Sequence, residues 1–464
     1  MRYVSTRGEA PHVGFLDAVL AGLAPDGGLY APETWPLLSE TEIAAFAGRP
    51  YAEVAADILA HFAGETIARA DLLEMANDAY AGFTHDAVAP LRQLGPGSWL
   101  LELFHGPTLA FKDIAMQLVA RLYEHALKAK GQTLTVVCAT SGDTGGAAVE
   151  ALGGAKGVRV VVLFPDGKIS DVQRRFITTS ARANVRAIAI DGTFDDCQAI
   201  VKGLFQAQGF PQAVNLSGVN SINWARIAAQ VVYYVTAAVA LGAPARPIAF
   251  CVPTGNFGDA FSGFVAHRMG VPIEKIVVAT NANDIVARAV ETGRYARGPV
   301  VATQTPAMDI QVSSNFERLY FEAVEREGLE VARTMRAFAE TGAVQLPPKA
   351  LKTIRALFSG VAVSEADTSR AIVSTFHATG QLIDPHTAVG VAAAERVRIH
   401  ARTPMVVLAT AHPAKFPDAV KAAAGAAPPR PRSVEALAKK AERIDKLPAD
   451  LEAVKAYVRA FAEA

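Results

Sequence analysis

The spacing of hydrophobic positions along the chain changes near residue 134. Before it, apolar residues recur at helical intervals between turn signals, which predicts a helical N-terminal region over residues 1–92. After it, short β-branched runs at 134–138, 159–164 and 185–190 alternate with glycine-containing turns and helical segments. Such alternation is typical of a parallel sheet that helices cover on both faces.

A second group of strands follows a long apolar segment. This segment, residues 227–243, is interrupted by polar residues, so we expect a buried helix instead of a membrane span. Strands are then expected at 248–252, 276–279 and 405–408. Residues 347–367 are expected to be helical and to form part of the connection between the domains.

These patterns predict an α/β protein with two open, largely parallel α/β domains and a helical N-terminal region. The tail is charged and helix-forming, and we expect it to pack on the outside. The expected division is an N-terminal region at 1–92, a large domain at 93–130 and 215–425, a small domain at 131–214, and the helical tail at 426–464.

Composition narrows the class of partner. The 464 residues include 45 Lys and Arg against 45 Asp and Glu, so the formal net charge is zero and nothing favours a nucleic acid. Cys138, Cys197 and Cys251 are far apart and form no metal-binding pattern, as is typical of a reducing cytosol. Residues 1–14 contain no apolar stretch of the kind that a secretory signal needs. We therefore expect a cytoplasmic protein with no metal ion and no membrane segment.

One lysine is the first candidate for chemistry. Lys112 follows a Gly-Pro turn in the segment His105–Asp113 and has Leu109 and Phe111 as neighbours. Apolar surroundings disfavour the ammonium form, and a neutral amine can attack an aldehyde to form a Schiff base. The alternative is a surface lysine whose stem lies on apolar surface while its ammonium group stays in water.

Two glycine-containing loops each follow a predicted strand and precede a helix. The loop 253–259 can direct several backbone N–H groups toward one point, which is a phosphate-binding geometry. The loop 140–146 offers hydroxyl and N–H groups that could hold a substrate carboxylate. The first lacks the Lys-Ser/Thr pair of a Walker loop, and the second lacks the spacing of a dinucleotide fingerprint. For both, the alternative is an ordinary turn in which glycine relieves backbone strain.

The segment 220–226 precedes the long apolar helix. Asn and Ser at such a place are most often helix caps. Its arginine, however, lies at the edge of an apolar segment, and a guanidinium suits bidentate phosphate recognition. The candidates for substrate binding in this segment are Asn220, Ser221, Asn223 and Arg226.

The loop after the strand at 405–408 supplies a hydroxyl. Thr410 stands at the carboxyl end of that strand, where side chains point into the ligand crevice of an open α/β sheet. His412 and Lys415 in the same loop are expected to be solvated, which is the usual state of such residues.

Seven motifs together resemble the bacterial and fungal threonine synthases, which are pyridoxal-phosphate enzymes with the tryptophan-synthase-β fold (PLP fold type II). The resemblance runs from residue 1 to about residue 420. The motifs are HGPTLAFKD (105–113), ATSGDTGGAA (139–148), NSINWARI (220–227), PTGNFGD (253–259), SSNFERL (313–319), LIDPHTAVG (382–390) and TAHPAKFPDAV (410–420).

The resemblance implies a role for most of these candidates. Lys112 would hold pyridoxal 5'-phosphate as an internal aldimine, and Thr410 would be the hydroxyl partner of the pyridine nitrogen. The cofactor phosphate would be cradled by Gly255, Asn256, Phe257, Gly258 and Asp259. The loop that faces the substrate carboxylate and the ring would include Ser141, Asp143 and Thr144. In relatives that act on serine derivatives, this loop usually carries Asn where Asp143 stands.

The implied reaction converts O-phospho-L-homoserine and water to L-threonine and phosphate, the last step of threonine biosynthesis. Lys112 would remove protons at Cα and Cβ, the γ-phosphate would leave, and water would then add at Cβ. The alternatives are a phospho-lyase that releases a 2-oxo acid, a threonine or serine ammonia-lyase, and a non-catalytic binding protein of the same fold. The expected assembly is a monomer or a homodimer.

Overall fold

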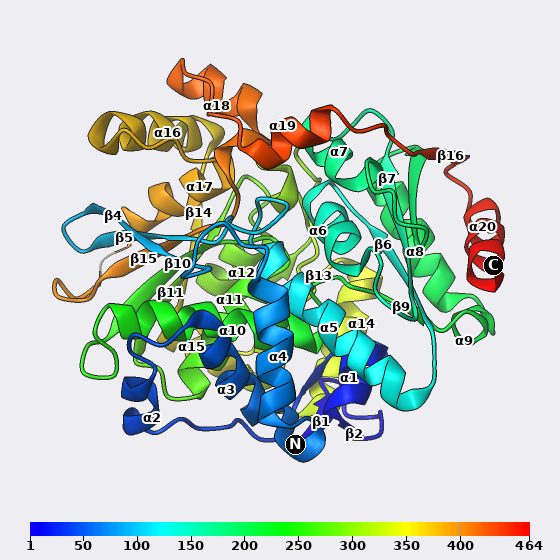
Figure 1. Ribbon diagram of the computed structural model, residues 1–464. Helices are drawn as coiled ribbons and strands as arrows, with labels where there is room; N and C mark the ends of the chain where they lie inside the picture. The colour runs from blue at the N-terminus through cyan, green and yellow to red at the C-terminus, as the bar shows by residue number, and fades with distance from the viewer. Residues whose placement is uncertain (398) are drawn as a thin grey trace.

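Two sheets lie side by side, and the N-terminal region packs across one end of both (Figure 1). The computed structural model describes residues 1–397 and 399–464. The N-terminal region contains a small antiparallel sheet besides the expected helices. Its elements are β1 (Arg2–Ser5), β2 (Val13–Gly14), α1 (Phe15–Ala21), β3 (Tyr30–Pro32), α2 (Glu40–Ala45), α3 (Tyr51–Ala63), η1 (Gly64–Thr66) and α4 (Arg69–Tyr80).

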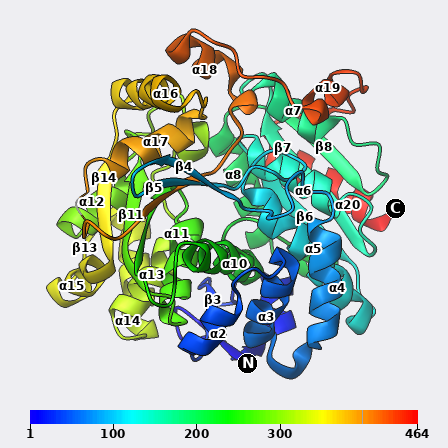
Figure 2. The ribbon, with the colours of Figure 1, turned by 60° about the vertical axis from the view of Figure 1, so that its left-hand side comes forward.

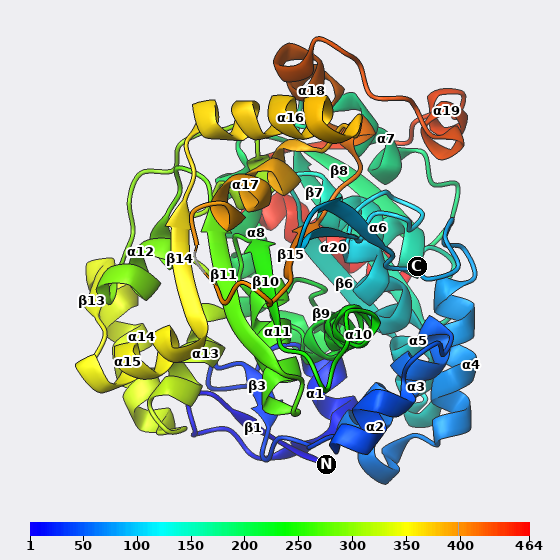
Figure 3. The same ribbon diagram turned by 90° about the vertical axis from the view of Figure 1, so that its left-hand side faces the viewer.

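The large domain is built on a six-stranded sheet, and Figure 3 shows its strands β14, β11, β10 and β15 side by side. Its strand order is β14 (Phe358–Ala362), β11 (Ile273–Thr280), β10 (Ile248–Pro253), β15 (Met405–Ala409), β5 (Ser98–Glu102) and β4 (Leu91–Gly95). All neighbours are parallel except β4 and β5. The three strands predicted here, at 248–252, 276–279 and 405–408, are confirmed.

The expectation of helix throughout residues 347–367 is wrong at its centre. There the chain forms β14, which pairs with β11 at the edge of the sheet. The sequence FSGVA is short and does not alternate between apolar and polar residues, so it carries little strand signal. The helices on either side are α15 (Pro348–Leu357) and α16 (Glu365–Thr379).

The small domain has a five-stranded parallel sheet. Its order is β16 (Asp445–Pro448), β8 (Val185–Asp191), β7 (Val158–Pro165), β6 (Leu134–Ala139) and β9 (Leu216–Ser217). The predicted strands at 134–138, 159–164 and 185–190 are confirmed, and β9 lies just beyond residue 214. The helices of this domain are α6 (Asp143–Leu152), α7 (Asp171–Thr178), α8 (Phe194–Gln206) and α9 (Phe210–Ala213).

The tail is neither purely helical nor confined to the outside. Its strand β16 adds to the small sheet beside β8, and α20 (Leu451–Glu463) buries Val454 and Val458 in the small-domain core. Before them, α19 (Arg432–Ala438) packs against α7. Figure 1 shows this part of the chain, in red, crossing from the large domain to the far side of the small one.

The long apolar segment forms α10 (Trp224–Ala240), which lies against α3, α5 (Lys112–Lys130) and α11 (Gly258–Arg268) (Figure 2). Its polar Gln230 is buried and donates to the carbonyl oxygen of Arg226, so its amide is satisfied inside the core. Among the described helices, none is long and apolar enough to cross a membrane. The remaining elements are α12 (Ile285–Thr292), β12 (Arg294–Ala296), η2 (Pro306–Met308), α13 (Phe316–Ala323), α14 (Gly328–Thr341), β13 (Ala343–Gln345), α17 (Pro385–Ala394), η3 (Pro413–Lys415) and α18 (Pro417–Ala424).

Candidate active site

A cavity lies between the two domains, where strands of both sheets end. Its wall includes residues that directly follow β6, β10 and β15. In open α/β sheets, ligands bind at this carboxyl edge of the strands. The cavity also contains the side chain of Lys112, the first residue of α5.

The structure places Lys112 in a largely dry position. Its side chain is 13% exposed, and Nζ lies 4.7 Å from the centre of the Phe111 ring. The N–H of Phe111 donates to the carbonyl oxygen of Thr410 over 2.8 Å, which ties the start of α5 to the end of β15. Burial lowers the pKa of Lys112, and the raising effect of Asp143 does not cancel it. The lysine is therefore suited to act as a nucleophile and a base.

The loop 254–258 forms a cradle of backbone donors. In the described part of the chain, the N–H groups of Gly255, Asn256 and Gly258 have no acceptor, and α11 begins at Gly258 without a side-chain cap. The carbonyl oxygens of the loop are held from behind: Ser313 donates to that of Gly255 over 2.8 Å, and Asn315 to that of Asn256 over 3.1 Å. Three free donors at a helix N-terminus form an anion site.

Phe257 and Asp259 shape this cradle; Asp259 also lines the cavity, whereas Phe257 does not. Phe257 has φ = 63°, a left-handed conformation that favours glycine, and its buried ring lies 5.5 Å from the Phe358 ring. The carboxylate of Asp259 accepts from the hydroxyl of Thr254 and from the N–H of Ala260. Burial raises the pKa of Asp259.

The loop 140–146 lies opposite Lys112, on the small domain. Ser141, Asp143 and Thr144 line the cavity. The hydroxyl of Thr140 accepts from the N–H groups of Gly142 and Gly145, both over 2.9 Å, and so fixes the turn into α6. Asp143 is 5% exposed, and its Oδ2 lies 3.8 Å from Nζ of Lys112.

Two ammonium groups stabilise the Asp143 carboxylate. Burial raises its pKa, but Lys415 and Lys112 outweigh that effect and hold the pKa of Asp143 well below its usual range. Asp143 is therefore ionised at neutral pH. This makes the loop a poor partner for a free carboxylate unless the neighbouring cations or N–H groups provide the contact.

The segment before α10 divides into residues inside and outside the cavity. Asn220, Ser221 and Arg226 line it. Burial lowers the pKa of Arg226 to about 10, with Asp259 opposing, so the guanidinium remains charged. Asn223 lies outside the cavity: its side chain caps α10 and donates to the carbonyl oxygen of Val19 and to the hydroxyl of Tyr123.

Sequence reasoning did not identify His386 as a site residue or Lys415 as a buried one. His386 lines the cavity beside Thr410, with Nδ1 2.8 Å from Oδ2 of the fully buried Asp384. Lys415 is 1% exposed and pairs with Asp143, so the expectation of a solvated lysine is wrong. The motif LIDPHTAVG at 382–390 includes His386 and could have identified it. No local feature of the sequence marks Lys415 as buried.

These residues fit pyridoxal 5'-phosphate. A Schiff-base amine, a phosphate cradle and the hydroxyl of Thr410, 5% exposed, surround one cavity. A Cβ on Gly255 would come within 3.2 Å of the carbonyl oxygen of Ala307, so the cradle is shaped for bare backbone. Among the residues that the structure describes, no cluster of three or more His, Cys, Asp or Glu could hold a metal ion.

Comparisons with known proteins cover the whole chain. The family models for "Threonine synthase N terminus", "Pyridoxal-phosphate dependent enzyme" and "Threonine synthase, C-terminal" match residues 2–80, 86–411 and 387–458. A threonine synthase of Pseudomonas aeruginosa is 48% identical, with 99% of this chain and 98% of that protein covered.

Solved structures extend the similarity to three dimensions. The PLP-bound threonine synthase of Brucella melitensis is 51% identical, with a TM-score of 0.97 over 100% of both chains. The threonine synthase of yeast is 36% identical, with a TM-score of 0.93 over 100% of this chain and 99% of that one.

Proposed function

The chain belongs to the threonine synthase family of pyridoxal-phosphate-dependent enzymes, and we propose that Lys112 binds the cofactor and that O-phospho-L-homoserine is the substrate. The observation that carries this proposal is the buried amine of Lys112 in one cavity with the backbone cradle at 254–258. When bound, pyridoxal 5'-phosphate withdraws electrons from the substrate Cα and so makes its proton acidic.

Lys112 is the proton carrier of the proposed mechanism. Its amine, once free of the cofactor, takes the proton from the substrate Cα, gives that proton up within the site and, neutral again, takes the proton at Cβ. The burial that lowers its pKa favours the neutral amine, which is the form that a base needs. One mobile side chain thus serves two neighbouring carbon atoms.

Further polar groups in the cavity wall bind the substrate. We assign the substrate phosphate to the region of Arg226 and Ser221, because a charged guanidinium and a hydroxyl line the cavity there. The N–H groups of the loop 141–144 face the amino-acid end; those of Ser141 and Thr144 have no acceptor among the described residues. Thr410, which lines the same cavity, would hold the pyridine nitrogen with its hydroxyl.

The test is product analysis with O-phospho-L-homoserine. We expect phosphate and threonine in equal amounts from the wild type and no threonine from Lys112→Ala, a loss of at least about 10³-fold in kcat, since the covalent and base functions vanish together. The control is Lys128→Ala, which removes an exposed lysine from the same helix. Phosphate with 2-oxobutyrate instead of threonine would indicate a phospho-lyase.

We also propose a cytoplasmic location and a monomeric or homodimeric state. The three cysteines support the first, since all are buried free thiols. Size-exclusion chromatography with light scattering measures the second, and a tetramer would contradict it.

A further inference from the structure

The loop after β15 carries a lysine that lies behind the cavity wall. Lys415 is 1% exposed, and its Nζ lies 2.7 Å from Oδ1 of Asp143 and donates to the carbonyl oxygen of Thr108 over 2.8 Å. A buried ammonium group carries a desolvation cost that its partners must offset. Its two contacts pair it with the loop opposite Lys112 and with the segment that leads into α5.

Asp143 lies between the ammonium groups of Lys112 and Lys415 and contacts that of Lys415 more closely. Its Oδ1 accepts from Lys415 and, over 3.0 Å, from the side-chain amide of Gln173. Its Oδ2 lies 3.8 Å from Nζ of Lys112, beyond hydrogen-bond distance. Lys415 and Gln173 thus hold the carboxylate on the side away from Lys112.

The Lys415–Asp143 pair joins the two domains. Lys415 follows the large-domain strand β15, whereas Asp143 begins the small-domain helix α6. Ser170, the N-cap of α7, donates to the carbonyl oxygen of Lys415 over 3.3 Å. The contact is therefore made only when the small domain is seated against the large one.

We propose that Lys415 is a positioning residue for the reaction: by pairing with Asp143, it keeps that carboxylate from forming a hydrogen-bonded ion pair with Lys112, whose Nζ stays 3.8 Å from Oδ2, so that the Lys112 amine stays free to exchange protons with the substrate. The inference rests on the proposed role of Lys112. Asp143 without Lys415 would have Lys112 as its nearest cation, and a close carboxylate stabilises an ammonium group.

The charges around the two lysines have the signs that this role requires. Burial is the largest influence on the pKa of Lys112 and lowers it; Asp143 raises it, while Arg226 and Lys415 lower it. The other titratable or charged groups that act on either lysine are Asp113, Asp259 and His412. Loss of Lys415 removes a positive charge that repels the ammonium form of Lys112. It also frees Asp143 to attract that ammonium form, so both effects raise the pKa of Lys112.

The experiment measures the pKa of Lys112 in the full-length chain freed of cofactor, by competitive acetylation at a series of pH values and peptide mass spectrometry. In Lys415→Met we expect this pKa to rise by about one unit. At any pH below the wild-type pKa, the fraction of Lys112 in the neutral form then falls about tenfold. In Lys415→Arg, which keeps the charge, we expect the pKa to stay near the wild-type value. In the holoenzyme, the acid limb of the kcat–pH profile should move to higher pH by a similar amount.

A second pair of variants tests whether Lys415 acts through Asp143. In the Asp143→Asn background, Lys415→Met should raise the pKa of Lys112 much less than in the wild type. An unchanged pKa in Lys415→Met, or an equal rise in both backgrounds, would overturn the proposal. Should Lys415→Met not fold, Lys415→Gln replaces it, because an amide can still donate to Asp143 and Thr108. Absence of threonine from the wild type would overturn the proposed function without touching these pKa values.

Discussion

At the scale of single residues, glycine sets how closely a phosphate can approach the main chain. Gly258 is the first residue of α11 and lies against Ser221 and Asn315. A Cβ at this position would come within 3.1 Å of Cβ of Ser221 and 3.2 Å of Nδ2 of Asn315. Asn315 also holds the carbonyl oxygen of Asn256, so a shift of its side chain would disturb the whole cradle.

We therefore expect Gly258→Ala to weaken cofactor binding about tenfold, which corresponds to about 1.4 kcal/mol. Titration of the cofactor-free chain with pyridoxal 5'-phosphate, followed by visible absorbance, measures this. Gly95→Ala is the matched control, because nothing lies within 4 Å of the added methyl group. Equal affinity in both variants would mean that the cradle tolerates a side chain.

At the scale of elements, β16 and α20 show how distant residues complete a sheet. Val454 and Val458, one helical turn apart, are fully buried on α20 against the small-domain core. Strand β16 extends the parallel sheet beyond β8, which would otherwise be its edge. The tail is thus a part of the small domain although it follows the large domain in sequence.

Val458→Ala is expected to destabilise the small domain by about 1–3 kcal/mol, since it removes buried methyl groups and leaves a cavity. Urea unfolding followed by circular dichroism should show a lower midpoint for this variant than for the wild type. Glu463→Ala, an exposed position on the same helix, serves as the control and should stay within about 0.5 kcal/mol of the wild type. Equal midpoints for the two variants would contradict a structural role for α20.

The same elements show what the sequence could predict. Apolar runs such as 134–138 and 248–252 identified most of the central strands, because strands buried on both faces are nearly all apolar. Strand β5, which lies between β15 and β4, was not predicted. The edge strands β14 and β16 escaped prediction, since an edge strand is half-exposed and β16 reads DKLP. In the site, the glycine loops and Lys112 were identifiable from local pattern. Lys415 was not, because its burial depends on Asp143, which lies 272 residues earlier in the chain and in the other domain.

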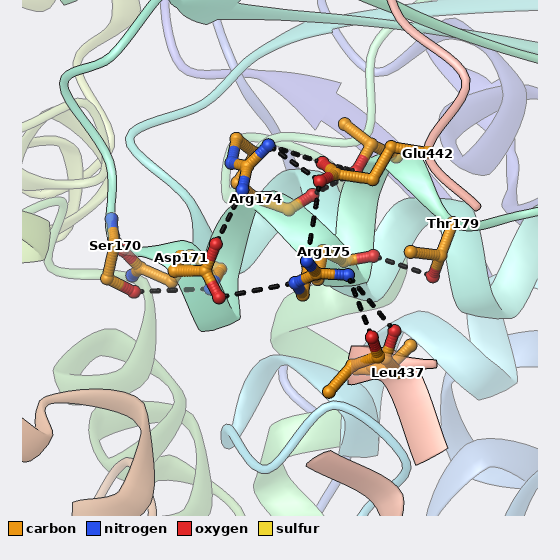
Figure 4. A network of polar contacts seen from close by, with 10 residues as sticks. Ser170, Asp171, Arg174, Arg175, Thr179, Leu437 and Glu442 are labelled. Carbon is orange, nitrogen blue, oxygen red and sulfur yellow. Dashed lines mark hydrogen bonds and ion pairs between the residues drawn. The ribbon is translucent and has the colours of Figure 1, made fainter. Parts of the chain in front are cut away.

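At the scale of the whole molecule, the segment from α18 to β16 acts as a strap between the domains. Glu442 in this strap accepts hydrogen bonds from Arg174 at 2.6 and 2.7 Å and from the hydroxyl of Thr178 at 2.7 Å (Figure 4). Arg175 donates to the carbonyl oxygen of Leu437. The strap thereby fixes α7, whose N-cap Ser170 contacts Lys415 beside the active site.

Glu442→Ala is expected to loosen the strap, because Arg174 and Thr178 lose a shared acceptor. The group is partly exposed, so the cost is about 1–2 kcal/mol and the fold survives. We expect faster cleavage within residues 425–445 in limited proteolysis and a KM for the substrate that is several-fold higher. Glu435→Ala removes an exposed carboxylate from α19 and is the control. An unchanged cleavage rate in Glu442→Ala would show that the strap is held elsewhere.

The position of β16 has a consequence for synthesis on the ribosome. Its partner β8 leaves the ribosome long before residues 445–448 are made, and the large-domain strands β10, β11, β14 and β15 are translated in between. During that interval β8 has an unpaired edge, which is the part of a sheet most prone to pair with other chains. Premature termination before residue 445 would leave this edge permanently open, so truncated chains should aggregate even though every residue that lines the catalytic cavity has already been translated.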